Sequence, residues 1–82
     1  MQKEFQVDLN MVESIKNFSF LAERTAADIK ALSGDYVVNG KSIMGLFSLN
    51  LSEPVTIRVS HDNESVVDHF IHEVKVMLTK QG

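Results

Sequence analysis

Apolar residues occupy every second position in residues 5–9 and again in residues 55–59. A period of two is typical of a strand that buries one face, so we predict strands at residues 2–8 and 55–60. Pro54 stands at the start of the second strand, where a missing N–H removes no interior ladder bond.

Two longer stretches carry apolar residues at helical spacing. The first predicts a helix over residues 11–24, where Asn10 and Glu13 resemble a capping box. The second predicts a final helix that Asp62 or Asn63 caps. Its broad apolar face comprises Val66, Val67, Phe70, Ile71, Val74, Met77 and Leu78.

The segment between these helices begins with a predicted hairpin. Residues 29–33 and 36–39 flank Gly34-Asp35, and both turn residues tolerate the positive φ of tight hairpin turns. Residues 40–50 then predict a helix of about two turns, with Ser42 as its N-cap and Asn50 as its stop. So short a helix must be held by tertiary contacts.

The short helix is more apolar than a surface helix needs to be, and it cannot bury every apolar side chain. We therefore expect Ile43, Met44 and Phe47 to form an exposed, partner-binding patch beside Ser42. Phe20 lies on the polar side of the preceding helix and would extend that patch.

The order strand, helix, strand, strand, short helix, strand, helix predicts an α+β fold. We expect an open-faced, two-layer sandwich, in which three helices cover one face of a four-stranded antiparallel sheet. The chain of 82 residues, 44% of them hydrophobic, suits a single domain over residues 1–82. The expected core comprises Phe5, Val7, Phe18, Ala22, Leu46, Leu49, Val55, Ile57, Phe70 and Val74.

Composition narrows the function classes. The chain has no cysteine, hence neither disulfides nor a thiolate zinc site, which favours a reducing compartment. A net charge of -3 with interleaved signs gives no basic stripe for direct nucleic-acid binding. No apolar run reaches the length of a membrane span, and the start lacks the apolar region of a signal peptide. We expect a cytoplasmic protein that does not bind membranes.

The three histidines predict no catalytic or metal site. His69 and His72 lie three residues apart on the final helix, but a zinc site lacks a third fixed ligand. His61 lies in the turn before that helix, at the opposite end from Met11 if the first and last strands pair. No nucleophile has a convincing base partner, so we expect neither an enzyme nor a cofactor.

The element order, the length and the run Lys-Ser-Ile-Met-Gly-Leu-Phe-Ser-Leu at residues 41–49 resemble HPr, the phosphocarrier family of the bacterial sugar phosphotransferase system. The resemblance is specific at this run and extends in weaker form over the whole chain. It implies that Ser42 is phosphorylated by an HPr kinase/phosphorylase. It also implies that the phosphoserine form binds a catabolite-control transcription regulator. A phosphate there would meet free N–H groups at a helix start.

The family's His-Ala-Arg-Pro-type run is missing. Counting back from Ser42 without gaps places Met11 at the phosphoryl-accepting histidine, Glu13 at the arginine and Ser14 at the proline. A thioether cannot carry a phosphoryl group as imidazole does, and Glu13 would repel a phosphate. The pattern resembles the Crh branch of the family, which keeps the regulatory serine and lacks the histidine.

This resemblance implies a regulatory protein in carbon catabolite control. Two alternatives stay open: a phosphocarrier with a displaced histidine, and an adaptor in which neither phosphorylation site is active. In the simplest alternative, Ser42 is an unmodified helix cap. The sequence leaves the oligomeric state open.

Overall fold

Strands and helices follow one another in the predicted order. The computed structural model describes residues 1–80, with side chains up to Leu78. The elements are β1 (Gln2–Val7), α1 (Val12–Arg24), β2 (Asp28–Ser33), β3 (Tyr36–Asn39), α2 (Ile43–Phe47), β4 (Val55–Ser60) and α3 (Glu64–Lys80). The predicted α+β class and the order βαββαβα are confirmed.

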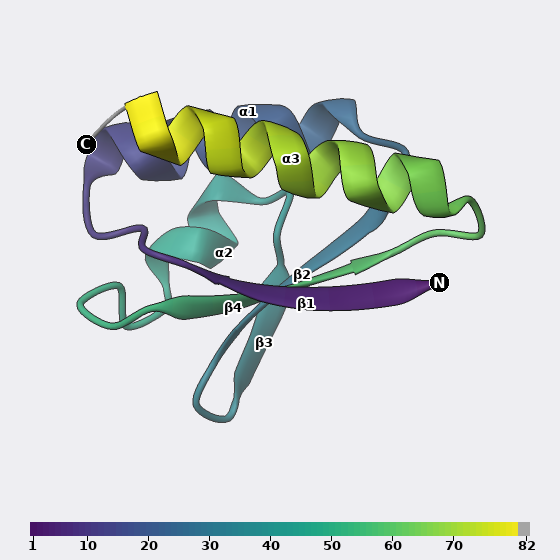
Figure 1. Cartoon of the computed structure of the whole chain (residues 1–82). Coiled ribbons are helices and arrows are strands. Elements are labelled where there is room, and N and C mark those ends of the chain that lie inside the picture. Colours follow the sequence, from purple (N-terminus) through teal and green to yellow (C-terminus); the bar gives the residue numbers. More distant parts are fainter. Residues whose placement is uncertain (81–82) are drawn as a thin grey trace.

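The sheet places the strands in the order β1-β4-β2-β3, and every neighbouring pair is antiparallel (Figure 1). Ile57 of β4 stands opposite Phe5 of β1 on one side and Ala31 of β2 on the other. The inner strand β4 buries every second residue, as its alternating sequence predicts, and Val55, Ile57 and Val59 are fully buried.

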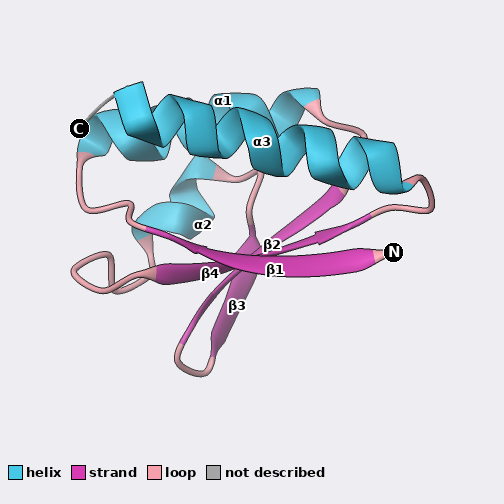
Figure 2. Cartoon of the chain, viewed as in Figure 1, coloured by secondary structure: helices cyan, strands magenta, loops and turns pink. Residues whose placement is uncertain are grey.

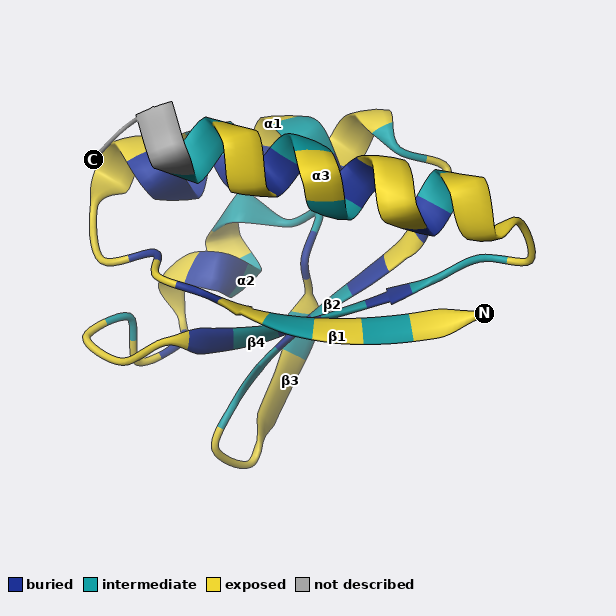
Figure 3. Ribbon diagram, viewed as in Figure 1, coloured by how far each residue is buried: buried dark blue, intermediate teal, exposed yellow. Residues whose placement is uncertain are grey.

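Helices α1 and α3 lie side by side over one face of the sheet, and the other face carries no helix of residues 1–80 (Figure 2). Helix α2 packs against α1 and β3. The buried residues lie where the two layers face each other (Figure 3). In the centre of this core, the rings of Phe18 and Phe70 meet edge to face, with centroids 5.9 Å apart and planes at 74°.

The expected core is correct except at Phe5, which is only half-buried and packs against the edge of the core. Phe5 belongs to β1, which is an edge strand with a neighbour on one side only. The pattern of alternation is right for β1, but alternation does not reveal which strand lies at an edge.

Helix α1 begins without the predicted capping box. Its N-cap is Met11, with φ -114 and ψ 141, and no side-chain cap bond is found there in the described structure. Asn10 instead donates its backbone N–H to Oδ1 of Asp8 at 3.3 Å. The Asp8 side chain thus organises the turn that leaves β1.

Two other turn predictions have mixed outcomes. In the β2–β3 hairpin, Gly34 alone within residues 1–80 has a positive φ, +58, so Asp35 does not use the left-handed region. At the start of α3, Oδ1 of Asn63 accepts the N–H of Ser65 at 2.9 Å. Asn63, one of the two predicted caps, therefore fills this role.

Candidate functional site

Ser42 is the N-cap of α2, as predicted. Its backbone is extended, with φ -99 and ψ 114, and its Oγ accepts the N–H of Gly45 at 3.1 Å. Its carbonyl oxygen accepts the N–H of Leu46 at 3.0 Å, which closes the first helical turn. The residue is half-buried. Ser42 is therefore partly accessible from the surface while α2 is intact.

The Ser42 hydroxyl uses only its acceptor capacity. Among the hydrogen bonds of residues 1–80, none is donated by the Ser42 hydroxyl proton. The hydroxyl of Ser48, just after the end of α2, differs because it donates to the carbonyl oxygen of Gly45 at 2.6 Å. Esterification of Ser42 would break no donated bond, whereas esterification of Ser48 would break one.

Two contacts hold the loop before Ser42 in place. Gly40 donates its N–H to the carbonyl oxygen of Ile29 at 2.8 Å, and a Cβ at Gly40 would collide with the Ile29 side chain. Lys41 reaches the end of α1, where its Nζ donates to the carbonyl oxygen of Thr25 at 2.9 Å. The position of Ser42 is thus fixed from both β2 and α1.

Helix α2 is shorter than expected. It ends at Phe47, and the following Ser48 keeps a right-handed conformation with φ -80 and ψ -10. The prediction that Asn50 stops the helix in a left-handed conformation is wrong, since no residue other than glycine among residues 1–80 has a positive φ. Oδ1 of Asn50 instead accepts the Ser52 hydroxyl at 2.6 Å, so its side chain shapes the next turn.

The apolar residues of α2 divide between the surface and the core. Met44 is 78% exposed and Phe47 is 46% exposed. Ile43 is half-buried and packs against the core, contrary to the expectation that it lies in the exposed patch. The reason is its spacing: Ile43 lies three residues before the buried Leu46 and shares its face of the helix.

Phe20 is exposed, but its neighbouring residues are not the ones expected. Its ring is 58% exposed, and the guanidinium of Arg24 lies over it at 5.2 Å from the ring centroid. A groove of about 390 Å³ runs beside it, between α1 and α3, and none of the lining residues belongs to α2. These residues are Asn17, Phe20, Leu21, His72, Glu73, Val76 and Met77. Phe20 is thus grouped with α3, and the structure does not join it to Met44 and Phe47.

The start of α1 carries no imidazole. Met11, at the position that the family resemblance assigns to the phosphoryl-accepting histidine, is 54% exposed, and Glu13 lies in the first turn. His61 donates its backbone N–H to the carbonyl oxygen of Met1, at the beginning of β1. Met11 follows the other end of that strand, so the prediction that His61 lies far from Met11 is confirmed.

The histidines of α3 lie on its exposed side. Nε2 of His69 is 3.2 Å from Oε1 of Glu73, one turn further along the helix. His72 lines the groove beside Phe20. Within residues 1–80, no three His, Cys, Asp or Glu side chains are placed to hold a metal ion. No helix of that part of the chain is long and apolar enough to cross a membrane.

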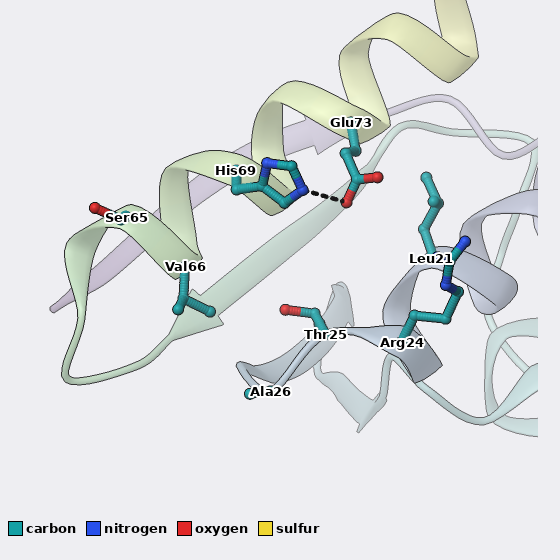
Figure 4. A pocket seen from close by; sticks show the side chains of 8 residues that line it. All are labelled: Leu21, Arg24, Thr25, Ala26, Ser65, Val66, His69 and Glu73. Atoms are coloured by element: carbon teal, nitrogen blue, oxygen red, sulfur yellow. Dashed lines mark ion pairs between the residues drawn. The ribbon is translucent and has the colours of Figure 1, made fainter.

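A second groove, of about 580 Å³, adjoins the first and was not predicted from the sequence (Figure 4). Leu21 and Arg24 of α1 face the His69–Glu73 ion pair of α3 across it. Its two walls come from segments far apart in the sequence, which no local pattern connects. The sequence offered a signal only for the adjoining groove, namely an aromatic residue, Phe20, on the polar side of a predicted helix.

Comparison with solved structures finds proteins of the same fold. The chain is similar to a phosphocarrier protein HPr from Bacillus anthracis str. Ames, with 32% identity, a TM-score of 0.66, and coverage of 85% of this chain and 90% of that one. It is also similar to HPr-C-His from Thermoanaerobacter tengcongensis, with 21% identity, a TM-score of 0.65, and coverage of 89% and 91%. No protein-family model and no curated protein matches the sequence.

Proposed function

This chain belongs to the HPr family of phosphocarrier proteins, and within that family we propose that it is a regulatory member whose signal is phosphorylation of Ser42. In this proposal an HPr kinase/phosphorylase-like enzyme modifies Ser42. A catabolite-control transcription regulator then recognises the modified protein. The chain itself catalyses no reaction and acts through the proteins that it binds.

The observation that carries the proposal is the state of the Ser42 hydroxyl. Ser42 is half-buried, and its hydroxyl proton takes part in no hydrogen bond described in the structure. Transfer of the γ-phosphoryl group from ATP breaks its anhydride bond to ADP, forms an Oγ–P bond and releases the hydroxyl proton and ADP, while the Oγ that caps Gly45 stays in place. The modification is therefore compatible with an intact α2.

The surface beside Ser42 supports a role in protein recognition. Met44 and Phe47 offer a flexible thioether and a rigid ring close to the modified residue in the sequence, and both are exposed. Phosphorylation would add about 1.5 to 2 negative charges at the rim of these side chains. Partners that present arginine would then be favoured, and partners that present carboxylates would be disfavoured.

The start of α1 argues against the family's carrier reaction. Met11 has no nitrogen that accepts a phosphoryl group, and Glu13 would place a negative charge where a phosphate has to be stabilised. The phosphocarrier alternative therefore requires His61, His69 or His72 as the acceptor. Each lies outside the start of α1.

The proposal is tested by incubating the protein with HPr kinase and ATP and mapping phosphate by mass spectrometry. We expect one phosphate on the parent protein and none on Ser42→Ala. Ser48→Ala is the matched control, since it removes a neighbouring hydroxyl and should still accept one phosphate. A parent protein that stays unmodified would overturn the proposal and leave the adaptor alternative.

A parallel reaction with phosphoenolpyruvate and the first enzyme of the phosphotransferase system tests the carrier alternative. We expect no acid-labile phosphohistidine. Its appearance on His61, His69 or His72 would establish the displaced-histidine carrier instead.

Met44→Asp tests the recognition surface separately. Because Met44 is 78% exposed, the variant should keep the parent's circular dichroism spectrum and melting temperature. Its binding to the kinase, measured by calorimetry, should weaken by about tenfold or more. Val37→Asp is the control, as Val37 is also an exposed apolar residue, 55%, but belongs to β3. Equal weakening by both variants would remove the assignment of this surface to Met44.

A further inference from the structure

Four residues on one face of α1 have a symmetric spacing, which reads the same from either end of the helix. Glu13, Asn17, Phe20 and Arg24 are spaced by four, three and four residues. At about 100° per residue these four side chains fall within about 60° of arc, so they form one stripe along the helix. Glu13 lies in the first turn of α1 and Arg24 in the last. The stripe is therefore acidic at one end and basic at the other.

We propose that this stripe, which we call the α1 seam, is the interface of a homodimer in which the α1 helices of two copies pack antiparallel. A two-fold axis between Asn17 and Phe20 would place each Glu13 opposite Arg24 of the second copy. The same axis would place each Phe20 opposite Asn17 of the second copy. Such an interface is self-complementary, as a two-fold symmetric contact must be.

The charges at the ends of the seam have no ion-pair partner within residues 1–80. Glu13 and Arg24 take part in none of the salt bridges there. The guanidinium of Arg24 is held over the ring of Phe20, 5.2 Å from its centroid. This contact orders the side chain and leaves its N–H donors available for a carboxylate. An antiparallel second copy supplies that carboxylate twice, once at each end.

The groove between α1 and α3 provides room for the aromatic anchor. It begins beside Asn17, has a volume of about 390 Å³, and is lined on the α3 side by His72, Glu73, Val76 and Met77. In the antiparallel arrangement, Phe20 of one copy arrives over Asn17 of the other and next to this groove. Aromatic side chains that enter a pocket near the centre of an interface contribute most of the binding energy.

The second groove extends the same channel towards the end of α1. Leu21 and Glu73 line both grooves, and Arg24 lines the second one (Figure 4). Nε2 of His69 lies 3.2 Å from a carboxylate oxygen of Glu73, so this carboxylate already has a partner on its own helix. Helix α1 of the second copy can thus lie over the channel between α1 and α3, so that the helices of the two copies form two stacked layers.

The proposed contact is small. Helix α1 has 13 residues, so it is about 20 Å long, and the contact adds only the flanking side chains of α3. We expect its area to fall near the lower end of specific interfaces, about 1,200 Å² in total. We expect a reversible dimer that forms as the concentration rises from micromolar to millimolar. The seam contains no residue of α2, so this inference does not depend on phosphorylation of Ser42.

Sedimentation equilibrium of the full chain from about 10 μM to 1 mM tests the proposal. We expect the parent protein to pass from monomer to dimer over this range. Glu13→Arg places two cations opposite each other and Arg24→Glu places two anions, so each should lower the association constant by at least tenfold. Glu23→Arg is the matched control: it makes the same charge change as Glu13→Arg on the same helix, about 100° from Arg24, and should dimerise like the parent.

Mixing the two variants tests whether opposite charges at both ends of the seam restore pairing. In a mixed dimer, the unchanged Arg24 of the first variant faces the unchanged Glu13 of the second. At the other end of the seam, the arginine introduced into the first variant faces the glutamate introduced into the second, so both pairs are again of opposite charge. An equimolar mixture should therefore recover dimerisation that neither variant shows alone. Circular dichroism spectra verify that each variant is folded.

Three results would overturn the proposal. A parent protein that is monomeric at 1 mM would show that another kind of partner occupies the groove, or none. Single variants that dimerise like the parent would place the dimer interface elsewhere, for example on the edge strand β1. A mixture that stays monomeric while the parent dimerises would exclude the antiparallel register.

Discussion

Replacing Phe70 by alanine tests the core on which the whole arrangement rests. Phe70 lies on α3, is fully buried, and meets Phe18 of α1 edge to face at 5.9 Å. Deletion of a fully buried Phe side chain typically destabilises a protein by about 3–5 kcal/mol through lost transfer energy and the cavity left behind. The lost edge-to-face contact accounts for roughly 0.5–1.5 kcal/mol of the interaction. We expect a total loss near 4 kcal/mol.

This loss is a large share of the stability of so small a domain. At about 0.05–0.15 kcal/mol per residue, 82 residues give a free energy of unfolding of roughly 4–12 kcal/mol. With an m-value of about 1.5 kcal/mol/M in urea, a loss of 4 kcal/mol lowers the unfolding midpoint by about 2–3 M. The assay is urea unfolding followed by far-ultraviolet circular dichroism at a few micromolar protein, where the proposed dimer is not populated.

Phe20→Ala is the matched control for this measurement. It removes the same side chain from the surface of α1, where the ring is 58% exposed, and should shift the midpoint by less than about 0.7 M. If Phe70→Ala unfolds at the parent's midpoint, the packing of α3 over the sheet is wrong. If both variants lose the same stability, burial is not what distinguishes the two positions.

Two further variants test single contacts. Gly40→Ala should lower the free energy of unfolding by about 1–3 kcal/mol, because its Cβ collides with the buried side chain of Ile29; an unchanged urea midpoint would contradict this packing. Nζ of Lys3 donates a hydrogen bond to Oδ1 of Asp68 at 2.6 Å and lies 3.4 Å from Oε2 of Glu64. The hydrogen bond to Asp68 is the main cause that raises the pKa of Lys3 above its ordinary 10.5. The contribution of Lys3 to stability is complete below the pKa that Lys3 has in the unfolded chain. It is lost as the pH rises through the higher pKa that Lys3 has in the folded protein. The parent should therefore be more stable than Lys3→Gln at pH 8, the difference should shrink above about pH 10.5, and a constant difference in urea titrations would exclude the linkage.

Local periodicity determined the elements because it depends only on neighbours in the sequence. The alternation in residues 55–59 and the helical spacing after Asn63 gave β4 and α3 the right type, and Ser42 capped α2 through a bond to Gly45, three residues away. Local reasoning failed where two local options compete. Asn10 and Asn50 were expected to bound helices. Instead, the backbone N–H of Asn10 bonds the side chain of Asp8, and the side chain of Asn50 accepts the hydroxyl of Ser52, so both residues shape turns.

The neighbours of each element were decided only by the tertiary structure. Phe5 is only half-buried because β1 is an edge strand, and Ile43 is half-buried because α2 turns the face that contains Leu46 towards the core. Phe20 was predicted to accompany the apolar residues of α2, yet it lines a groove with Val76 of α3. The sequence establishes that Phe20 lies on the polar side of its helix. The sequence does not establish which helix packs beside this face of α1. That depends on how segments far apart in the sequence share one core, because burial is a property of the packed layers and not of the local chain.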